Sequence, residues 1–299
     1  MECVAVGNLK MMVIANPLAG SRGARWRGLD PEKVLRPLFP GAELYFTKGE
    51  GDATLAARQA AQDGYDLVVA AGGDGTVNEV ANGLALSETQ MGLFPLGTEN
   101  VLAKERHIPK NFEKAAALIL RTKPRLMDLG KIADRYFVCF AGIGFDAHVV
   151  EKVRPGMKAR LGSVAYMVTA VEHFFKYNET RRHFRIEIDD EVIEAESWQI
   201  LMGNIQTYGG GLRATPRASM HDGLLDMVIL PRTDLPGMLH QVAAAATGAH
   251  LKIANVRYYQ GRRFRFECSE PVSYQIDGDL GGQAPLEVEL IPKALLVRF

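Results

Sequence analysis

The chain has 299 residues, of which 47% are hydrophobic and 23% charged, as expected for a packed globular protein. Lys and Arg together number 35, as do Asp and Glu, so the formal net charge is zero. This balance excludes a strongly basic nucleic-acid binder, and no run reaches the roughly 18 consecutive apolar residues that suggest a membrane-spanning helix. The length is sufficient for two domains.

The cysteines and the N-terminus favour a reduced, cytoplasmic protein. Cys3, Cys139 and Cys268 are odd in number, far apart and without metal-ligand spacing. The stretch from Met1 to Pro17 lacks the basic start and long apolar core of a secretory signal.

The first third of the chain alternates strand and helix patterns. Strands are expected at KMMVIANP, AELYFT, YDLVVAA and MGLFPL, and a helix is expected to begin at Asp52. Strands separated by helices indicate βαβ units and a parallel sheet. We therefore predict an α/β domain over residues 1–125.

From about Leu126 the pattern changes to short strands joined by turns. The stretch RLMDLGKIADRYFVCFAG is typical of a hairpin, and four later segments are also strand-like. Helices are expected near Lys158–Tyr177 and Leu235–Ala249. We predict a mostly antiparallel, β-rich domain over residues 126–299, and we leave open whether the last residues return to the first domain.

A glycine-rich corner follows the third strand. Gly72, Gly73 and Gly75 surround Asp74 at the point where a helix pattern begins. Glycines allow backbone N–H groups to approach an anion, and a helix N-terminus favours a phosphate there. The Thr76 and Glu79 pair predicts a capping box, with the helix starting at Thr76. A carboxylate beside a phosphate is reasonable if Mg²⁺ or a reacting hydroxyl lies between them.

Two well-known phosphate motifs do not fit this corner. No Walker-type loop is present, and Asn78 stands where G-x-G-x-x-G needs its third glycine. A strand–turn–helix corner with glycines for tight packing alone remains an alternative. A second corner, PLGTEN, follows the fourth strand, and two such loops at neighbouring strand ends would form one crevice. Purely structural roles also remain open, with Thr98 as a helix cap and Thr47 as the end of a strand.

Together these segments resemble the catalytic domain of the diacylglycerol kinase and sphingosine kinase superfamily, most closely the bacterial soluble lipid kinases. The motifs that carry the resemblance occur in the family's order: NPLAG, GGDGTVNEVANGL, PLGTEN, AGIGFDAHVV, GGGLRATPRASMHDGLLD and IDGD. The resemblance implies an N-terminal domain like that of NAD kinase, a β-rich lipid-binding domain, and ATP with Mg²⁺ as phosphate donor.

The resemblance also implies which residues bind the nucleotide and which accept the proton. The implied nucleotide contacts are Thr47, Gly72, Gly73, Asp74, Gly75, Thr76, Val77, Asn78, Thr98 and Asn100. Asp277 and Asp279 occupy the family's Asp-Gly-Glu-like motif, and we assign the proton acceptor to Asp279, with Asp277 orienting the site and Asp74 the next candidate. Without the resemblance, Asp-Gly-Asp is an ordinary turn.

A structural Mg²⁺ site is implied at Ser219, Asp222 and Leu224, the last through its carbonyl group. Ser219 replaces an aspartate of the family pattern, and one charge fewer should weaken Mg²⁺ binding. Asp222 with Gly223 as a plain turn is the alternative. Val101 and Lys104 also depart from the family, which has aspartate and arginine there, so a charge network toward Asp128 and Asp74 is expected to be rearranged.

The substrate side is less specific. Leu161, Val164, Val168, Val171 and Phe175 form one stripe of the expected helix, which favours core packing over the wall of an acyl cleft. Basic residues before it, Lys152, Arg154, Lys158 and Arg160, suit either anionic lipid or plain solvation. We predict a lipid kinase acting on a membrane lipid such as diacylglycerol, with transient membrane contact, no nucleic acid, and a homo-oligomer as an open option. A soluble-substrate kinase like NAD kinase and a regulator without turnover are the alternatives.

Overall fold

The computed structural model describes residues 9–20, 26, 28–153, 164–178 and 182–299. The chain divides into two compact units. The first contains the residues up to Asp128 together with Pro292–Phe299, and the second contains Leu129–Ile291. The strands β5 (Arg125–Ile132) and β15 (Leu286–Arg298) each contribute residues to both units.

The first unit is built on a parallel sheet, as the sequence predicted. Its strands lie in the order β2–β1–β3–β4–β15, and every pair is parallel. The new strands are β1 (Met11–Ala15), β2 (Glu43–Phe46), β3 (Leu67–Gly72) and β4 (Gln90–Pro95). β1 and β3 are buried along their whole length, which explains why they are apolar throughout instead of alternating.

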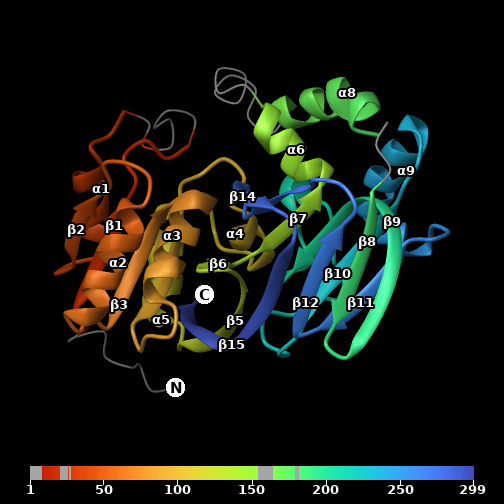
Figure 1. Cartoon of the computed structure of the whole chain (residues 1–299). Coiled ribbons are helices and arrows are strands. Elements are labelled where there is room, and N and C mark those ends of the chain that lie inside the picture. The colour runs from red at the N-terminus through yellow and green to blue at the C-terminus, as the bar shows by residue number, and fades with distance from the viewer. Residues whose placement is uncertain (1–8, 21–25, 27, 154–163, 179–181) are drawn as a thin grey trace. The chain divides into compact units, whose positions relative to one another are not determined.

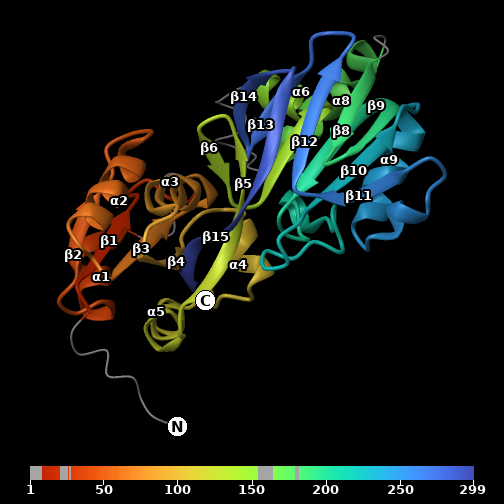
Figure 2. The same ribbon diagram turned by 60° about the horizontal axis from the view of Figure 1, so that its bottom comes forward.

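Helices cover both faces of this sheet. They are α1 (Pro31–Leu38), α2 (Asp52–Gln62), α3 (Asp74–Leu84), the short α4 (Val101–Glu105) and α5 (Phe112–Arg121). Figure 2 shows α2 and α3 together on one face of the sheet, and α1 and α5 on the other. Small residues at the contact let α2 and α3 approach closely, since Ala53, Ala57 and Gly83 are buried there.

The second unit is mostly antiparallel, again as predicted. Its strands are β6 (Arg135–Phe137), β7 (Phe140–Gly144), β8 (His183–Ile188), β9 (Glu191–Gly203), β10 (Leu225–Pro231), β11 (Arg257–Gly261), β12 (Arg263–Cys268), β13 (Ser273–Ile276) and β14 (Asp279–Gln283). The long strand β9 pairs with β8 through its first half and with β7 and β10 through its second half. It therefore connects the two sheets that enclose the apolar core of this unit.

Within the described residues of the second unit, the α-helices are α6 (Phe145–Lys152), α8 (Val164–Asn178) and α9 (Leu235–Ala245). Phe145, Phe174 and Trp198 form an aromatic cluster that joins α6 and α8 to β9. Cys139 and Cys268 are free thiols, and Cys3 lies outside the described residues. Figure 1 shows the helices and strands of both units.

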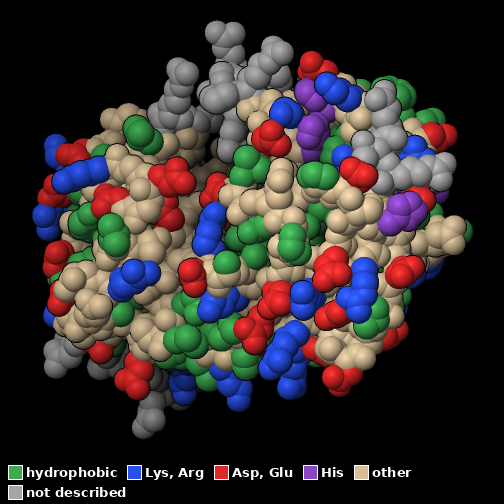
Figure 3. All heavy atoms as spheres, viewed as in Figure 1, with side chains coloured by type: hydrophobic (Ala, Val, Ile, Leu, Met, Phe, Trp, Pro, Cys, Tyr) green, Lys and Arg blue, Asp and Glu red, His purple; other side chains and the backbone are tan. Residues whose placement is uncertain are grey.

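On the face shown in Figure 3, Lys and Arg side chains are interspersed with Asp and Glu side chains, in keeping with the zero formal net charge. No helix in the described part of the chain is long and apolar enough to cross a membrane.

Close packing of α2 and α3 makes a testable prediction for Gly83. A Cβ at this position would lie 2.6 Å from the Cβ of Ala57 and 2.6 Å from the carbonyl oxygen of Thr54. Gly83→Ala should therefore lower the free energy of unfolding by about 1–3 kcal/mol, the usual cost of overpacking. Urea denaturation measures this change.

The matched control is Gly75→Ala in the same helix, because a Cβ at Gly75 meets nothing within 4 Å. This variant should be neutral or stabilised by up to about 1 kcal/mol, since alanine favours helix over glycine. Equal stability of Gly83→Ala and the wild type would contradict the described helix contact.

Candidate functional site

Both glycine corners lie at the carboxyl edge of the parallel sheet. β3 and β4 are hydrogen-bonded neighbours, with Gly72 opposite Pro95, so the loops that follow them begin side by side. The chain after β1 and after β2 reaches the same edge, where Asn16 and Thr47 follow these strands. In open α/β sheets this edge is where ligands bind, and the predicted neighbourhood of the two corners is confirmed.

The two corners touch through their backbones. A Cβ on Gly97 would lie 2.5 Å from the Cα of Gly73, and a Cβ on Gly73 would lie 3.2 Å from the Cα of Gly97. Both positions therefore require glycine because of the close approach of two main chains. Tight packing therefore accounts for both glycines. The same contact leaves these two positions without side chains, so it is compatible with access of an anion to the backbone.

A hydrogen bond of Asp74 links the first corner to the second. The Asp74 Oδ1 accepts a hydrogen bond of 2.6 Å from the backbone N–H of Val101, at the start of α4. Burial raises the pKa of the Asp74 carboxyl, the N–H groups of Val101 and Asn100 oppose this shift, and Glu99 adds to it. Val101 takes part in this contact through its backbone and not through its side chain.

The capping box predicted at Thr76 and Glu79 is wrong. The helix α3 begins at Asp74 with Gly73 as N-cap, and no side chain caps it. Thr76 is buried and packs over Gly72, where a Cβ would lie only 2.4 Å from its side chain. Glu79 instead accepts from the N–H of Ala53 (3.0 Å) and so caps the neighbouring helix α2.

Several predicted nucleotide contacts have their side chains committed to the fold. Val77 and Asn78 are buried in α3, and Asn82 donates to both the carbonyl and the side-chain oxygen of Asn78. Asn100 closes its own loop, accepting from Gly97 N–H (2.8 Å) and donating to the Gly97 carbonyl (2.7 Å). At Val77, Asn78 and Asn100, a ligand would therefore contact the backbone and not the side chains.

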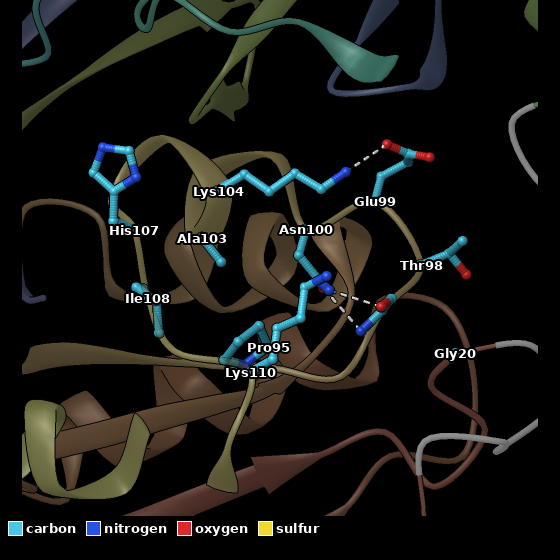
Figure 4. A pocket seen from close by; sticks show the side chains of 11 residues that line it. Gly20, Pro95, Thr98, Glu99, Asn100, Ala103, Lys104, His107, Ile108 and Lys110 are labelled. Carbon is cyan, nitrogen blue, oxygen red and sulfur yellow. Dashed lines mark hydrogen bonds and ion pairs between the residues drawn. The ribbon is translucent and has the colours of Figure 1, made fainter. Parts of the chain in front are cut away.

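A cavity of about 650 Å³ lies in the first unit beside the second corner (Figure 4). Its lining residues are Gly20, Pro95, Gly97, Thr98, Glu99, Asn100, Ala103, Lys104, His107, Ile108 and Lys110. Thr98 and Asn100 are predicted nucleotide contacts, and Gly20 ends the NPLAG loop. Lys104 forms an ion pair with Glu99 (2.9 Å). The volume lies in the range of ligand pockets.

In the second unit, Asp277 and Gly278 form the two-residue turn between β13 and β14. Both residues have positive φ, 47° and 93°, as a type I′ hairpin turn requires. The Asp277 carboxylate accepts three backbone hydrogen bonds, from Val138 (2.7 Å), Cys139 (3.0 Å) and Phe140 (2.8 Å). Its oxygens are therefore engaged in holding the start of β7.

Asp279 has a very different environment. Its side chain is 58% exposed and lies 3.4 Å from the guanidinium of Arg135, which also donates to the carbonyl of Leu280 (3.4 Å). The two carboxylates of the motif therefore differ in what their oxygens contact. Asp277 holds the start of β7 in place, whereas the Asp279 side chain is exposed.

The predicted metal residues lie on the segment that leads into β10. Ser219 is half-buried, Asp222 is exposed, and the Asp222 Oδ1 accepts from the N–H of Leu224 (3.1 Å). Among the described residues, no group of three His, Cys, Asp or Glu side chains is placed to hold a metal ion. Nearby, however, the fully buried Asp226 has an Oδ2 without a hydrogen-bond partner in the described structure, which is an environment that fits a cation.

The stripe expected to pack α8 into the core does not do so. Val168, Val171 and Phe175 are 46%, 42% and 63% exposed, whereas Thr169, Phe174 and Tyr177 are buried. Leu161 lies outside the described residues, as do Arg154, Lys158 and Arg160 of the basic segment, and the Val164 side chain is not described. Lys152 is paired with Glu151 (2.7 Å).

Sequence reasoning missed Arg135 and Asp226. The sequence around Arg135 does not indicate its role, because its partner Asp279 is 144 positions away. Asp226 does carry one, since it interrupts the apolar run LLDMVIL of a buried strand. A carboxylate in such a run needs a compensating partner.

The first unit is an α/β domain with paired glycine corners, and the second is a β-rich unit with an exposed carboxylate at Asp279. Residues 10–132 match the family described as the diacylglycerol kinase catalytic domain. Residues 140–299 match the YegS C-terminal NAD kinase beta sandwich-like domain. The chain therefore belongs to the diacylglycerol kinase and YegS type of lipid kinases, and it is a kinase.

Curated relatives and a solved structure agree with this assignment. A diacylglycerol kinase of Staphylococcus carnosus is 30% identical over 277 residues, covering 91% of this chain and 89% of the relative. One from Bacillus subtilis is 33% identical over 240 residues, covering 79% and 78%. A crystal structure of a Bacillus anthracis diacylglycerol kinase, 25% identical, superposes with a TM-score of 0.76 over 97% of this chain and 96% of that one.

The contrast between Asp277 and Asp279 predicts different effects on stability. Asp277→Asn weakens a carboxylate that accepts three buried N–H groups, and it should cost about 1–3 kcal/mol of unfolding free energy. Asp279→Asn removes only an exposed ion pair and should cost less than about 1 kcal/mol. Thermal or urea unfolding of both variants tests this, and a larger loss for Asp279→Asn would reverse the assignment.

Proposed function

We propose that this kinase transfers the γ-phosphate of ATP to a hydroxyl of a membrane lipid such as diacylglycerol. The observation that carries the proposal is the contact between Gly73 and Gly97, which places two loop positions without side chains and the N-terminus of α3 at one sheet edge. Such an arrangement suits the phosphates of a nucleotide. Family membership and the names of the relatives support a lipid as the acceptor.

In this proposal the nucleotide lies on the corner loops, with the NPLAG loop and Thr47 at the same edge. Thr98 faces the cavity of the first unit and is available to the ligand. Asp74 is the carboxylate of this corner, and it would hold Mg²⁺ through water. Mg²⁺ held there would offset the negative charge of the phosphates, which is one requirement of phosphoryl transfer.

Asp279 is the proposed proton acceptor. It is exposed, whereas Asp277 is engaged by three N–H groups, so Asp279 is the carboxylate of the motif that can reach a hydroxyl. Arg135 keeps this side chain oriented. Removing the proton makes the lipid oxygen nucleophilic as the phosphoryl group transfers, and no covalent enzyme intermediate is needed.

Transfer of labelled γ-phosphate to a panel of diacylglycerol, sphingosine, ceramide, phosphatidylglycerol and NAD tests the proposal. We expect labelled lipid, with diacylglycerol preferred. Labelled NAD would instead support a soluble-substrate kinase. ATP binding without any labelled product would support a regulator without turnover.

Replacing the proton acceptor should reduce turnover selectively. Asp279→Asn keeps the size of the side chain but cannot accept a proton at neutral pH, so kcat should fall by about 10²–10⁴-fold while ATP affinity is unchanged. Asp279→Glu should retain substantial activity. Asp190→Asn, an exposed aspartate of the β8–β9 turn, is the matched control.

Two results would change the assignment. If Asp279→Asn turns over normally and Asp277→Asn folds but is inactive, Asp277 is the acceptor. If both variants are active, the motif serves only as a turn and Asp74 is the next candidate.

We also propose that the kinase acts from the cytoplasm and meets the membrane through α8. Val168, Val171 and Phe175 are three and four positions apart, so they form one exposed apolar stripe. An exposed apolar face on a helix is suited to the headgroup boundary of a bilayer, where the proposed substrate is dissolved. The basic residues preceding α8 in the sequence would add attraction to anionic lipid.

The full-length protein should bind anionic vesicles weakly, and binding should decrease with salt. Phe175→Ser and Val171→Ser should weaken binding in a flotation assay, whereas Val192→Ser, which replaces a valine 53% exposed on β9, should not. Binding that ignores both salt and lipid charge, or that all three variants retain equally, would exclude this docking face.

A further inference from the structure

A buried glutamine connects the turn before Asp279 to the rest of the second unit. Gln275 lies on β13, three positions before Gly278, and is only 1% exposed. Its Oε1 accepts the backbone N–H of Gly278 (2.7 Å), and its Nε2 donates to the Oδ2 of Asp146 (3.1 Å). Both ends of the amide are therefore engaged, one with the turn and one with α6. We call Asp146, Gln275 and Gly278 the glutamine link.

Asp146 is the fixed end of the glutamine link. It is the second residue of α6, which packs against β13 and β14 (Figure 1). Its side chain covers Gly142 of β7, where a Cβ would lie 1.8 Å from the Asp146 Oδ2. The Asp146 N–H donates to Gln199 of β9 (2.8 Å), and its two oxygens also accept from the Ala147 N–H (2.7 Å) and the Tyr208 hydroxyl (3.2 Å). Contacts with two strands and with its own helix therefore hold this carboxylate in place.

The backbone of the turn has to set the direction of the Asp279 side chain. The ion pair with Arg135 is long (3.4 Å) and exposed, and such surface pairs contribute only about 0–1 kcal/mol. The first turn residue, Asp277, is fixed on β7 by three N–H groups. The second, Gly278, directly precedes Asp279, and a glycine has a wider choice of φ than any other residue. Its N–H is held by Gln275.

We propose that Gln275, held by Asp146, is a positioning residue for Asp279, an inference that rests on the proposed role of Asp279 as proton acceptor. By fixing the Gly278 peptide, Gln275 fixes the point from which the Asp279 side chain extends. Gln275 takes no proton itself and acts only through Asp279. Displacement of a reacting group by about 1 Å can reduce a rate by about 10²-fold, so the glutamine link should matter for turnover.

The first test replaces Gln275 with a side chain of similar length that has no amide. Gln275→Met loses the hydrogen bonds to Gly278 and to Asp146, so kcat for lipid labelling should fall by about 10–10²-fold, with ATP affinity unchanged. The matched control is Gln283→Met, the same change at an exposed position of the same hairpin, which should keep wild-type turnover. Urea unfolding checks that each variant is folded.

A double variant separates positioning from general damage to the fold. If Gln275 acts through Asp279, Gln275→Met should lower the residual kcat of Asp279→Asn by less than about twofold, because no acceptor is left to position. The full loss seen in the wild-type background, repeated in the Asp279→Asn background, would overturn the proposal.

A conservative variant tests the contact with Asp146 and keeps the test decisive if Gln275→Met folds poorly. Gln275→Glu retains an oxygen for the Gly278 N–H, and its carboxyl can donate to Asp146 only when protonated. Burial already raises the pKa of the Asp146 carboxyl, and two carboxyls at this distance share a proton at low pH and repel each other at high pH. The kcat of Gln275→Glu relative to the wild type should therefore fall as pH rises.

Adding Asp146→Asn should remove that pH dependence, because an amide at position 146 can donate to the introduced carboxylate. A relative kcat of Gln275→Glu that is constant with pH would exclude a role for Asp146.

Hydrogen exchange of the Gly278 amide tests the glutamine link without turnover. Exchange should be about 2–10-fold faster in Gln275→Met than in the wild type, as for the loss of one ordinary hydrogen bond, and unchanged in Gln283→Met. Equal protection in Gln275→Met and the wild type would overturn the proposal. If the wild-type protein labels no acceptor, the proposed function fails, and the exchange rates still decide whether Gln275 holds the turn.

Discussion

The carboxyl edge of the parallel sheet in the first unit depends on the close approach of two main chains at Gly73 and Gly97. A single methyl group at Gly97 would lie 2.5 Å from the Cα of Gly73, so the two loops cannot both keep their positions with any larger residue. Asp74 holds the arrangement from the other side by accepting the Val101 N–H. The contact is therefore possible only without side chains at these two positions, and the hydrogen bond of Asp74 fixes the loops before any ligand binds.

Some acidic residues stabilise the fold, and others are available for another role. The difference lies in whether their oxygens already accept hydrogen bonds from the protein. Asp277 accepts three N–H groups at the start of β7, and Asp128 is buried and accepts the Lys293 N–H (2.7 Å). Carboxylates whose oxygens accept backbone N–H groups in this way have little hydrogen-bonding capacity left for chemistry. Asp279, exposed beside Arg135, and Asp226, with an uncompensated buried oxygen, are the ones whose surroundings leave a role open.

Local sequence patterns predicted most of the helices and strands. The predictions failed where a residue's partner lies far away in the sequence. The parallel and antiparallel halves, the adjacency of the two corners and the turn at Asp277 follow from apolar runs, glycines and the Asp-Gly pair. The helix start at Asp74 did not follow, because Thr76 packs on Gly72 and Glu79 caps another helix. The exposed stripe of α8 was also mispredicted, because apolar spacing defines a helix face without saying which face is covered.

The division of β15 between the two units has a consequence for biosynthesis. Leu296–Arg298 complete the parallel sheet beside β4, and the Ala294 carbonyl accepts the Leu86 N–H. On the ribosome, the first unit must therefore wait for the whole second unit to be translated before its sheet can close. During that time β4 presents an unpaired edge of the kind that other strands can join, so the nascent chain is most exposed to aggregation while its later half is still being made.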